Sequence, residues 1–123
     1  MNEIRHLKML IVDDEEALCE MMHLILKDEK CLIDCACSLK EGKEKWQRDI
    51  PPIVLLDDYL PDGRGIDMIE NNLTLLNNCK VIMITDDDLP STQKKAKSLG
   101  VNYFIQKPLS LKVIKELMDL IVG

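Results

Sequence analysis

The sequence contains no apolar run that approaches the roughly 20 residues needed to span a bilayer. Residues 1–6 are polar, with no long apolar segment of the kind that opens a secretion signal. It also has no internal repeat and no low-complexity segment. These absences argue against a membrane protein and an exported one, and we expect a cytoplasmic protein.

Cysteine and histidine motifs are absent as well. The cysteines are odd in number and never form C-x-x-C, and His6 and His23 have no companion ligands at metal-binding spacing. We therefore expect neither a disulfide framework nor a zinc site. We interpret the five cysteines as small core residues in a reducing compartment, and they are Cys19, Cys31, Cys35, Cys37 and Cys79.

The chain has no excess of positive charge. Its net charge is −6, divided into −8 over residues 1–79 and +2 over residues 80–123. This balance argues against direct nucleic-acid binding. With 46% hydrophobic and 31% charged residues in 123, the composition is that of one ordinary globular domain spanning residues 1–123.

What the sequence does contain is a regular alternation of apolar runs and amphipathic stretches. The runs predict buried strands over residues 8–12, 31–36, 53–57, 80–85 and 101–105. The stretches between and after them predict helices over residues 15–29, 38–48, 66–76, 89–99 and 110–121. The pattern is typical of an α/β fold with a doubly wound parallel sheet and helices on both faces.

Local signals fix several helix ends. Ser38 and Glu41 have the spacing of a capping box, Ser110 is a suitable N-cap, and Gly100 is a suitable residue just after a helix. The helix over 89–99 has little apolar surface beyond Ala96 and its two end leucines. We expect it to be loosely held, which favours a movable surface.

Three of the predicted strands deliver polar residues to one edge of the sheet. If the strands starting near Met9, Ile53 and Val81 are neighbours, their ends gather Asp13, Asp14, Asp57 and Thr85, and Lys107 follows the last strand. Close carboxylates repel unless a cation neutralises them, and an oxygen-only ligand set favours Mg²⁺. The chemistry this predicts is phosphoryl transfer to a carboxylate, with Asp57 as the acceptor.

These separated motifs, in this order, resemble the receiver domain of two-component response regulators, the CheY-like superfamily. The resemblance covers nearly the whole chain. It rests on Asp13-Asp14, Asp57 followed by Leu60-Pro61 and Gly65, Thr85, Phe104 and Lys107-Pro108. It implies a single-domain (βα)5 three-layer sandwich whose five-stranded parallel sheet has the flavodoxin-like order 2-1-3-4-5.

The resemblance also implies roles for individual residues. Asp57 would accept a phosphoryl group from a phosphohistidine on a sensor histidine kinase or a histidine phosphotransfer protein. Asp14 would bind Mg²⁺ directly and Asp13 largely through water, with Asp57 and the backbone carbonyl of Tyr59 as further ligands. Lys107 would pair with the phosphate. The protein would catalyse only its own aspartyl phosphorylation and dephosphorylation.

The resemblance also implies that phosphorylation changes the structure of one face of the domain. Thr85 would hydrogen-bond the phosphate and move toward it, and Phe104 would swing inward, with Tyr103 as the alternative switch aromatic. This would alter the face made by the helix over 89–99, the strand over 101–105 and the last helix. An output domain or protein target would read that face, with the chain as a monomer or a phosphorylation-dependent homodimer.

Some positions depart from the family pattern. Asp86 follows Thr85 where receivers usually carry a small residue, and Asp58 adds a carboxylate beside the acceptor, with its side chain expected on the opposite side of the strand. Asp87 and Tyr59 occupy positions that tune phosphoryl lifetime in the family.

Three interpretations stay open at this stage. The chain stands alone or forms the N-terminal part of a longer regulator, and some segments are similar to receivers of transcriptional regulators. A pseudo-receiver that binds partners without phosphate is an alternative. A haloacid-dehalogenase-type phosphatase is another, although that family needs an Asp where Tyr59 stands.

Overall fold

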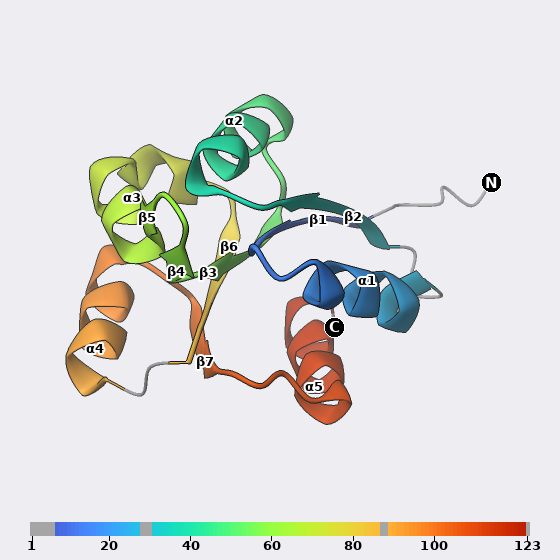
Figure 1. Ribbon diagram of the computed structural model, residues 1–123. Helices are drawn as coiled ribbons and strands as arrows, with labels where there is room; N and C mark the ends of the chain where they lie inside the picture. The colour runs from blue at the N-terminus through green and yellow to red at the C-terminus, as the bar shows by residue number, and fades with distance from the viewer. Residues whose placement is uncertain (1–6, 28–30, 87–88, 123) are drawn as a thin grey trace.

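A five-stranded parallel sheet forms the centre of the computed structural model, which describes residues 7–27, 31–86 and 89–122 (Figure 1). In spatial order its strands are β2 (Cys31–Ala36), β1 (Leu7–Val12), β3 (Ile53–Asp57), β6 (Lys80–Thr85) and β7 (Tyr103–Gln106). Counted along the chain within this sheet, the order is 2-1-3-4-5. The predicted topology is confirmed.

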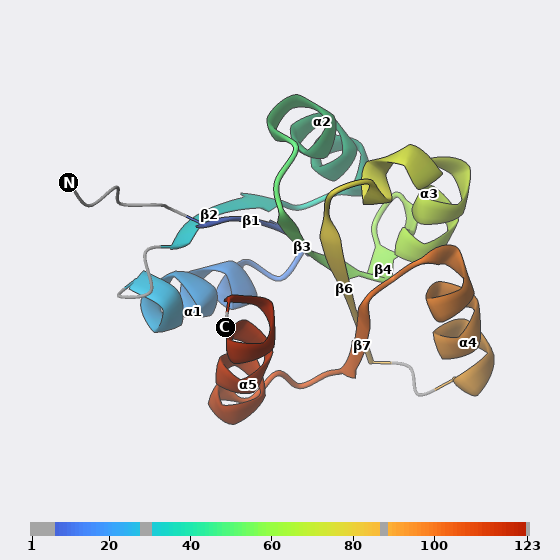
Figure 2. The same ribbon diagram turned by 180° about the vertical axis from the view of Figure 1, so that it is seen from behind.

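Helices cover both faces of the sheet, as Figures 1 and 2 show. One face carries α1 (Glu16–Leu26) and α5 (Leu111–Val122), and the other carries α2 (Leu39–Asp49), α3 (Gly65–Asn71) and α4 (Pro90–Leu99). The predicted three-layer sandwich is therefore confirmed. Within the described ranges, no helix is both long enough and apolar enough to cross a membrane.

The central strands are apolar over most of their length because both of their faces are covered. In β1, Leu10 and Val12 pack toward α2 and α3, whereas Met9 and Ile11 pack toward α1 and α5. All five residues of β3 are buried. Alternating side chains of one strand thus supply two separate core layers, which is why these runs show no polar face.

The predicted helix ends are observed. Ser38 Oγ accepts a hydrogen bond from the Glu41 N–H at 3.1 Å, and Ser110 Oγ accepts one from the Val113 N–H at 3.1 Å. Gly100 ends α4 with φ +105°, a left-handed conformation that glycine adopts without a Cβ clash.

Two local features differ from the expectation. The third helix ends at Asn71, because the Asn72 side chain donates to the Met68 carbonyl at 2.8 Å and the chain continues as a 3-10 turn, η2 (Leu73–Leu76). The turn after β3 forms a small antiparallel hairpin of β4 (Tyr59–Leu60) and β5 (Gly63–Arg64). Both differences arise from local hydrogen bonds and leave the predicted order of strands and helices unchanged.

The interpretation of the cysteines as unpaired core residues is wrong for three of them, because two are bonded to each other and one is exposed. Cys19 on α1 and Cys35 on β2 form a disulfide, with their Cα atoms 6.3 Å apart. This distance is ordinary for a disulfide and arises because α1 packs beside β2, a contact that linear spacing does not reveal. Cys31, Cys37 and Cys79 are free, and Cys37 is exposed. His6 lies outside the described residues.

Candidate functional site

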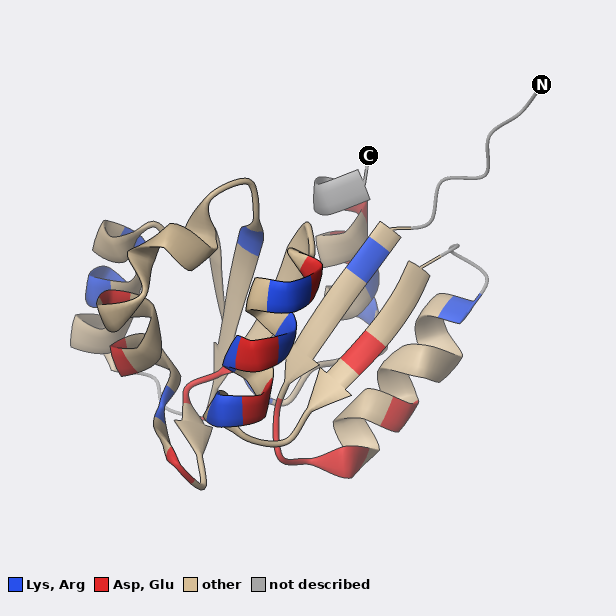
Figure 3. Ribbon diagram, turned by 90° about the horizontal axis from the view of Figure 1, so that it is seen from above, with Lys and Arg blue, Asp and Glu red and all other residues tan. Residues whose placement is uncertain are grey.

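The carboxyl ends of β1 and β3 place two aspartates side by side. Val12 pairs with Leu56 in the sheet register, so Asp13 and Asp57 follow at the same edge. Both are 5% exposed, while Asp14 is exposed. One carboxylate oxygen from each of the three lies within 4.8 Å of the others. Figure 3 shows the acidic loops at this end of the sheet.

Lys107 lies in the loop after the edge strand β7, and its side chain extends to the same aspartates. Its N–H donates to the Thr85 carbonyl at 2.8 Å, which fixes the loop after β7 against the end of β6. Its Nζ lies 2.9 Å from Asp13 Oδ2, 3.4 Å from Asp57 Oδ2 and 3.3 Å from Glu15 Oε1. The Lys107 ammonium group therefore forms ion pairs with all three carboxylates.

The charge balance at the site is unfavourable to ionised Asp57. Burial, followed by the charge of Asp13, raises the pKa of Asp57 to about 6, although the Tyr59 N–H and Lys107 act in the opposite direction. For Lys107, burial favours the neutral amine, but the hydrogen bond to Asp13 and the charges of Asp13 and Asp57 outweigh it and raise its pKa. The cluster is short of positive charge.

A divalent cation fits this donor set. Asp13 Oδ2 is buried, and its one charged partner among the described residues is Lys107, whose Nζ lies 2.9 Å away. The three clustered carboxylates offer oxygen alone, which Mg²⁺ prefers over nitrogen or sulfur. Asp13, Asp14 and Asp57 are thus the residues that would hold such an ion.

Thr85 is fully buried at the end of β6, the strand that pairs with β3. The Asp58 N–H donates to the Ile84 carbonyl at 3.0 Å, so the two strand ends stay in register up to Asp57 and Thr85. Thr85 therefore lies on the strand directly beside the aspartate.

Phe104 lies outside the carboxylate cluster. It is half-buried on β7 and packs against the core layer on the α4 side, whereas Tyr103 packs against the layer that includes α5 residues. The two candidate switch aromatics therefore face different layers. Only Phe104 borders the layer that Ala96 of α4 joins.

Asp58 has a structural role distinct from that of its neighbour. Its side chain is fully buried, forms an ion pair with Arg64, and accepts a hydrogen bond from the Ile66 N–H at 3.1 Å. The Arg64 guanidinium also lies 4.3 Å from the Tyr59 ring centroid. As expected from strand geometry, Asp58 points away from Asp57, and it joins β3 to the start of α3.

Several contributing residues were not predicted. Glu15 is a partner of Lys107, Arg64 neutralises Asp58, and Asp62 accepts hydrogen bonds from the Leu39 and Lys40 N–H groups at 2.8 and 3.0 Å. Each contact joins residues distant in sequence or across a turn. No spacing rule signals them.

The entrance to the site is acidic. Asp86 is exposed and lines a hollow of about 360 Å³ together with Glu15 and Lys107. Its carboxylate adds negative charge on the side from which a phosphate would approach Lys107. Asp87 lies outside the described residues.

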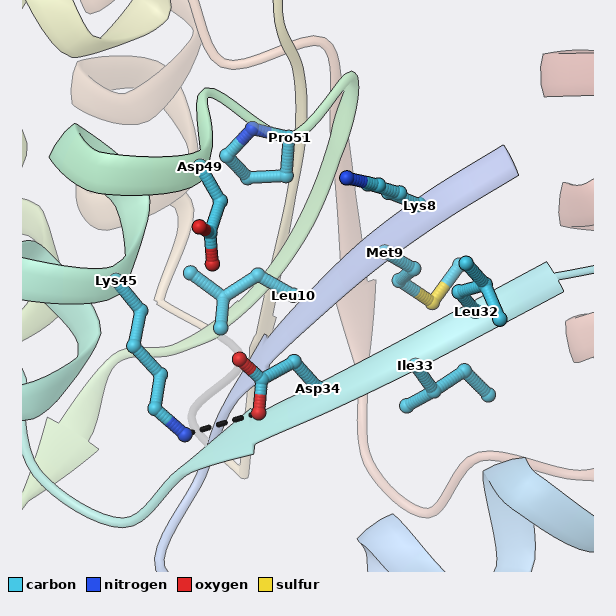
Figure 4. A pocket seen from close by; sticks show the side chains of 9 residues that line it. All are labelled: Lys8, Met9, Leu10, Leu32, Ile33, Asp34, Lys45, Asp49 and Pro51. Carbon is cyan, nitrogen blue, oxygen red and sulfur yellow. Dashed lines mark hydrogen bonds and ion pairs between the residues drawn. The ribbon is translucent and has the colours of Figure 1, made fainter. Parts of the chain in front are cut away.

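A second hollow, of about 210 Å³, lies over β1 and β2 beside α2 (Figure 4). Lys45 lines it but is already paired, with its Nζ 2.9 Å from Asp34 Oδ1 and 2.7 Å from the Cys35 carbonyl. Its lining shares no residue with the aspartate cluster. This hollow is therefore separate from the aspartate cluster.

Comparison with known proteins agrees with this geometry. The family model for the response regulator receiver domain matches residues 9–119. The chain is 30% identical over 112 residues to the transcriptional regulatory protein CitB of Klebsiella pneumoniae, covering 89% of this chain and 48% of that protein. It is 32% identical over 111 residues to the response regulator protein PilR of Pseudomonas aeruginosa, covering 90% of this chain and 25% of that protein.

Solved structures show the same fold. The non-phosphorylated HemR receiver domain from Leptospira biflexa superposes with a TM-score of 0.85 at 25% identity, covering 95% of this chain and 94% of that one. A CheY-like receiver domain protein from Methanospirillum hungatei gives a TM-score of 0.86 at 24% identity, covering 96% and 95%. The chain spans half or less of the length of the two curated regulators and nearly all of these two receiver domains.

Proposed function

Because the chain belongs to the family of response regulator receiver domains, we propose that Asp57 accepts a phosphoryl group and that the domain switches state when it does so. The observation that carries the proposal is the position of Asp57, which is the last residue of β3, lies within 4.8 Å of two other carboxylates and has Lys107 Nζ 3.4 Å away. As a receiver, the chain is a signalling domain and not an enzyme with an external substrate.

The transfer step follows from the contacts of Asp57. Its Oδ2 faces Lys107, and its Oδ1 accepts a hydrogen bond from the Tyr59 N–H at 3.3 Å. A carboxylate oxygen attacks the phosphorus of a phosphohistidine, an O–P bond forms, the N–P bond breaks and the histidine nitrogen keeps the bonding pair. Lys107 then neutralises an oxygen of the transferred group.

Asp13 and Asp14 complete the site by holding Mg²⁺ together with Asp57, with the carbonyl of Tyr59 as a further ligand. When bound, the ion offsets the charge of the phosphoryl oxygens. Asp13 lies against Lys107 Nζ at 2.9 Å, so it also keeps the lysine directed at the acceptor.

The signal leaves through the face made by α4, β7 and α5. Thr85 ends β6 and its carbonyl accepts the Lys107 N–H, so a movement of Thr85 toward a phosphoryl group is transmitted to the loop after β7. Phe104, on β7, is the switch aromatic that follows, because it packs in the layer that α4 joins. Only Ala96 of α4 is buried, which leaves this helix free to shift.

The domain spans residues 1–123, and its donor is a sensor histidine kinase or a histidine phosphotransfer protein. The similarity to CitB supports a place at the N-terminal part of a transcriptional regulator, whose output domain or protein target reads the α4–β7–α5 face. The receiver itself contacts no nucleic acid. It works as a monomer or as a homodimer formed on phosphorylation.

Beryllofluoride binding tests the proposal, because beryllofluoride on a carboxylate mimics the aspartyl phosphate. We expect chemical-shift changes around Asp57 in wild type when Mg²⁺ is present, and none with a chelator. Asp57→Asn is expected to show none in either case. Asp67→Asn, which removes an exposed carboxylate of α3, is the matched control and is expected to respond as wild type does.

The alternatives give different results in the same assay. A phosphate-independent pseudo-receiver would bind neither Mg²⁺ nor beryllofluoride. A haloacid-dehalogenase-type phosphatase would hydrolyse p-nitrophenyl phosphate with turnover. Equal responses from wild type and Asp57→Asn would overturn the assignment of the acceptor.

A further inference from the structure

A second group of side chains of types that bind metals lies where α1 packs beside β2. Cys19 and His23 are one turn apart on α1, and Cys35 is on β2. Both cysteines are half-buried and His23 is exposed. One ligand atom from each of the three residues lies within 4.8 Å of the others. None of these residues has a part in the phosphoryl chemistry.

The distances match those of a zinc site. Cys19 Sγ lies 3.6 Å from His23 Nδ1. Zinc bonds of about 2.3 Å to sulfur and about 2.05 Å to nitrogen, at a tetrahedral angle, separate the two ligand atoms by about 3.6 Å. The helix therefore already holds one sulfur and one nitrogen at the separation that a tetrahedral ion requires.

The two cysteines are compatible with the same geometry. Two thiolates on one zinc ion lie about 3.8 Å apart, which is further than the bonded sulfurs of the disulfide. Their Cα atoms are 6.3 Å apart, so rotation of the two side chains can provide this separation once the disulfide is reduced.

His23 is exposed, and its ring can present Nδ1 to an ion. Nδ1 now lies 2.9 Å from the Cys19 carbonyl oxygen, so metal binding through Nδ1 replaces this hydrogen bond and leaves the ring proton on Nε2. Two thiolates and an imidazole favour zinc-class ions over Mg²⁺, which distinguishes this group from the aspartate cluster.

We propose that Cys19, His23 and Cys35 bind one zinc-class ion when the cysteines are reduced, and that the disulfide is the state that excludes the metal. On binding, two thiols lose their protons to solvent, two S–Zn bonds and one N–Zn bond form, and water takes the fourth position. On oxidation by hydrogen peroxide, the two sulfurs give up two electrons and form the S–S bond, the O–O bond breaks, its oxygens take two protons from solvent and leave as water, and the ion is released.

Cobalt(II) is the probe that tests this, because thiolate ligands give it a near-ultraviolet charge-transfer band. The reduced full chain, with excess Mg²⁺ to occupy the aspartate cluster, is titrated with Co²⁺ and then with Zn²⁺. We expect a thiolate band that saturates at one equivalent and is abolished by Zn²⁺. Protein oxidised with peroxide is expected to give no band.

Variants assign the ligands. Cys19→Ser and Cys35→Ser are expected to lose the band. His23→Gln, an exposed position whose change leaves the core intact, is expected to weaken Co²⁺ binding at least tenfold. Cys37→Ser removes an exposed free thiol and is the matched control, with binding as in wild type.

Several results would overturn the proposal. These are a reduced wild-type protein without a thiolate band, a band that survives in Cys19→Ser, or a band that disappears in Cys37→Ser. A Zn²⁺-induced rise in the melting temperature of reduced wild type, smaller in His23→Gln at the same Zn²⁺ concentration, would support it independently of the cobalt spectrum. The result is also independent of beryllofluoride binding at Asp57.

Discussion

Asp57 is buried beside a second carboxylate, and this position makes its ionisation sensitive to pH. Lys107 stabilises the charged form, yet burial and Asp13 have the larger effect. The adjacent Asp58 is more deeply buried but is neutralised by Arg64. Two neighbouring residues of the same type thus have different roles: one is short of positive charge and suited to take up a cation and a phosphoryl group, and the other joins β3 to α3.

The raised pKa of Asp57 predicts a pH dependence of stability in metal-free protein. The unfolded chain ionises this carboxyl near its ordinary pKa of 3.8 and the folded chain near about 6. Between these values the folded state binds more protons, so the free energy of unfolding from this group decreases as pH rises from about 4 to about 6, by up to about 3 kcal/mol. Urea unfolding at several pH values measures the decrease.

Asp57→Asn is the control for this titration, since it removes the ionisable group and should flatten the profile over that window. Saturating Mg²⁺ above pH 6 should restore stability in wild type by favouring the ionised form. A wild-type profile identical to that of Asp57→Asn would contradict the raised pKa.

Arg64 is predicted to matter for stability because of the carboxylate it neutralises. In Arg64→Ala the fully buried Asp58 loses its cation and keeps the hydrogen bond from the Ile66 N–H. We expect a loss of about 2–4 kcal/mol in the free energy of unfolding, measured by chemical denaturation. The matched control is Arg48→Ala, because Arg48 pairs with Asp49 at the surface, and its stability should equal that of wild type. Equal stability of the two variants would refute this role of Arg64.

Among the elements, α4 is the least firmly packed helix in its own layer. It buries Ala96 alone, whereas α2 buries Leu39, Gly42 and Trp46. A salt bridge between Lys95 and Glu70, at 2.8 Å, connects it to α3 at the surface. An element held by so little apolar contact is a suitable one to move when the site changes charge.

Lys107 is the link between the site and this face, and its removal should separate binding from response. We predict that Lys107→Ala still binds beryllofluoride with Mg²⁺ but no longer changes the chemical shifts of α4 and β7. The aspartate ligands remain, whereas the contact of Nζ with Asp13 and Asp57 is lost. Heteronuclear NMR spectra with and without the mimic provide the test. Wild-type-like changes on α4 would show that the signal takes another route.

How far the sequence predicts these elements depends on how local their causes are. Apolar runs predicted all five strands of the main sheet, and Ser38, Ser110 and Gly100 predicted helix ends, because those signals lie within a few residues. The end of α3 at Asn71 was missed because it depends on one side-chain bond of Asn72. The Cys19–Cys35 bond was missed because it depends on how α1 packs beside β2.

At the scale of the whole molecule, the sheet order brings together two charged residues from opposite ends of the sequence, Asp13 and Lys107. Asp13 follows β1 and Lys107 follows β7, and β3 and β6 lie between them, yet the two charges are 2.9 Å apart. The strand-end aspartates, Thr85 and Lys107 could be predicted from sequence because each ends or follows an apolar run. The pairing of Glu15 with Lys107 and of Arg64 with Asp58 could not, since it depends on side-chain directions in the folded chain.

The most direct test of the central claim is to locate the phosphoryl group. The full chain is incubated with acetyl phosphate and Mg²⁺, its intact mass is measured, and the modified residue is identified by peptide mass spectrometry after trapping the acyl phosphate with borohydride. We predict one phosphoryl group per chain, on Asp57, which does not form when Mg²⁺ is chelated before acetyl phosphate is added and is absent from Asp57→Asn. A phosphoryl group on Asp58 or another residue, or none in wild type with Mg²⁺, would contradict the account.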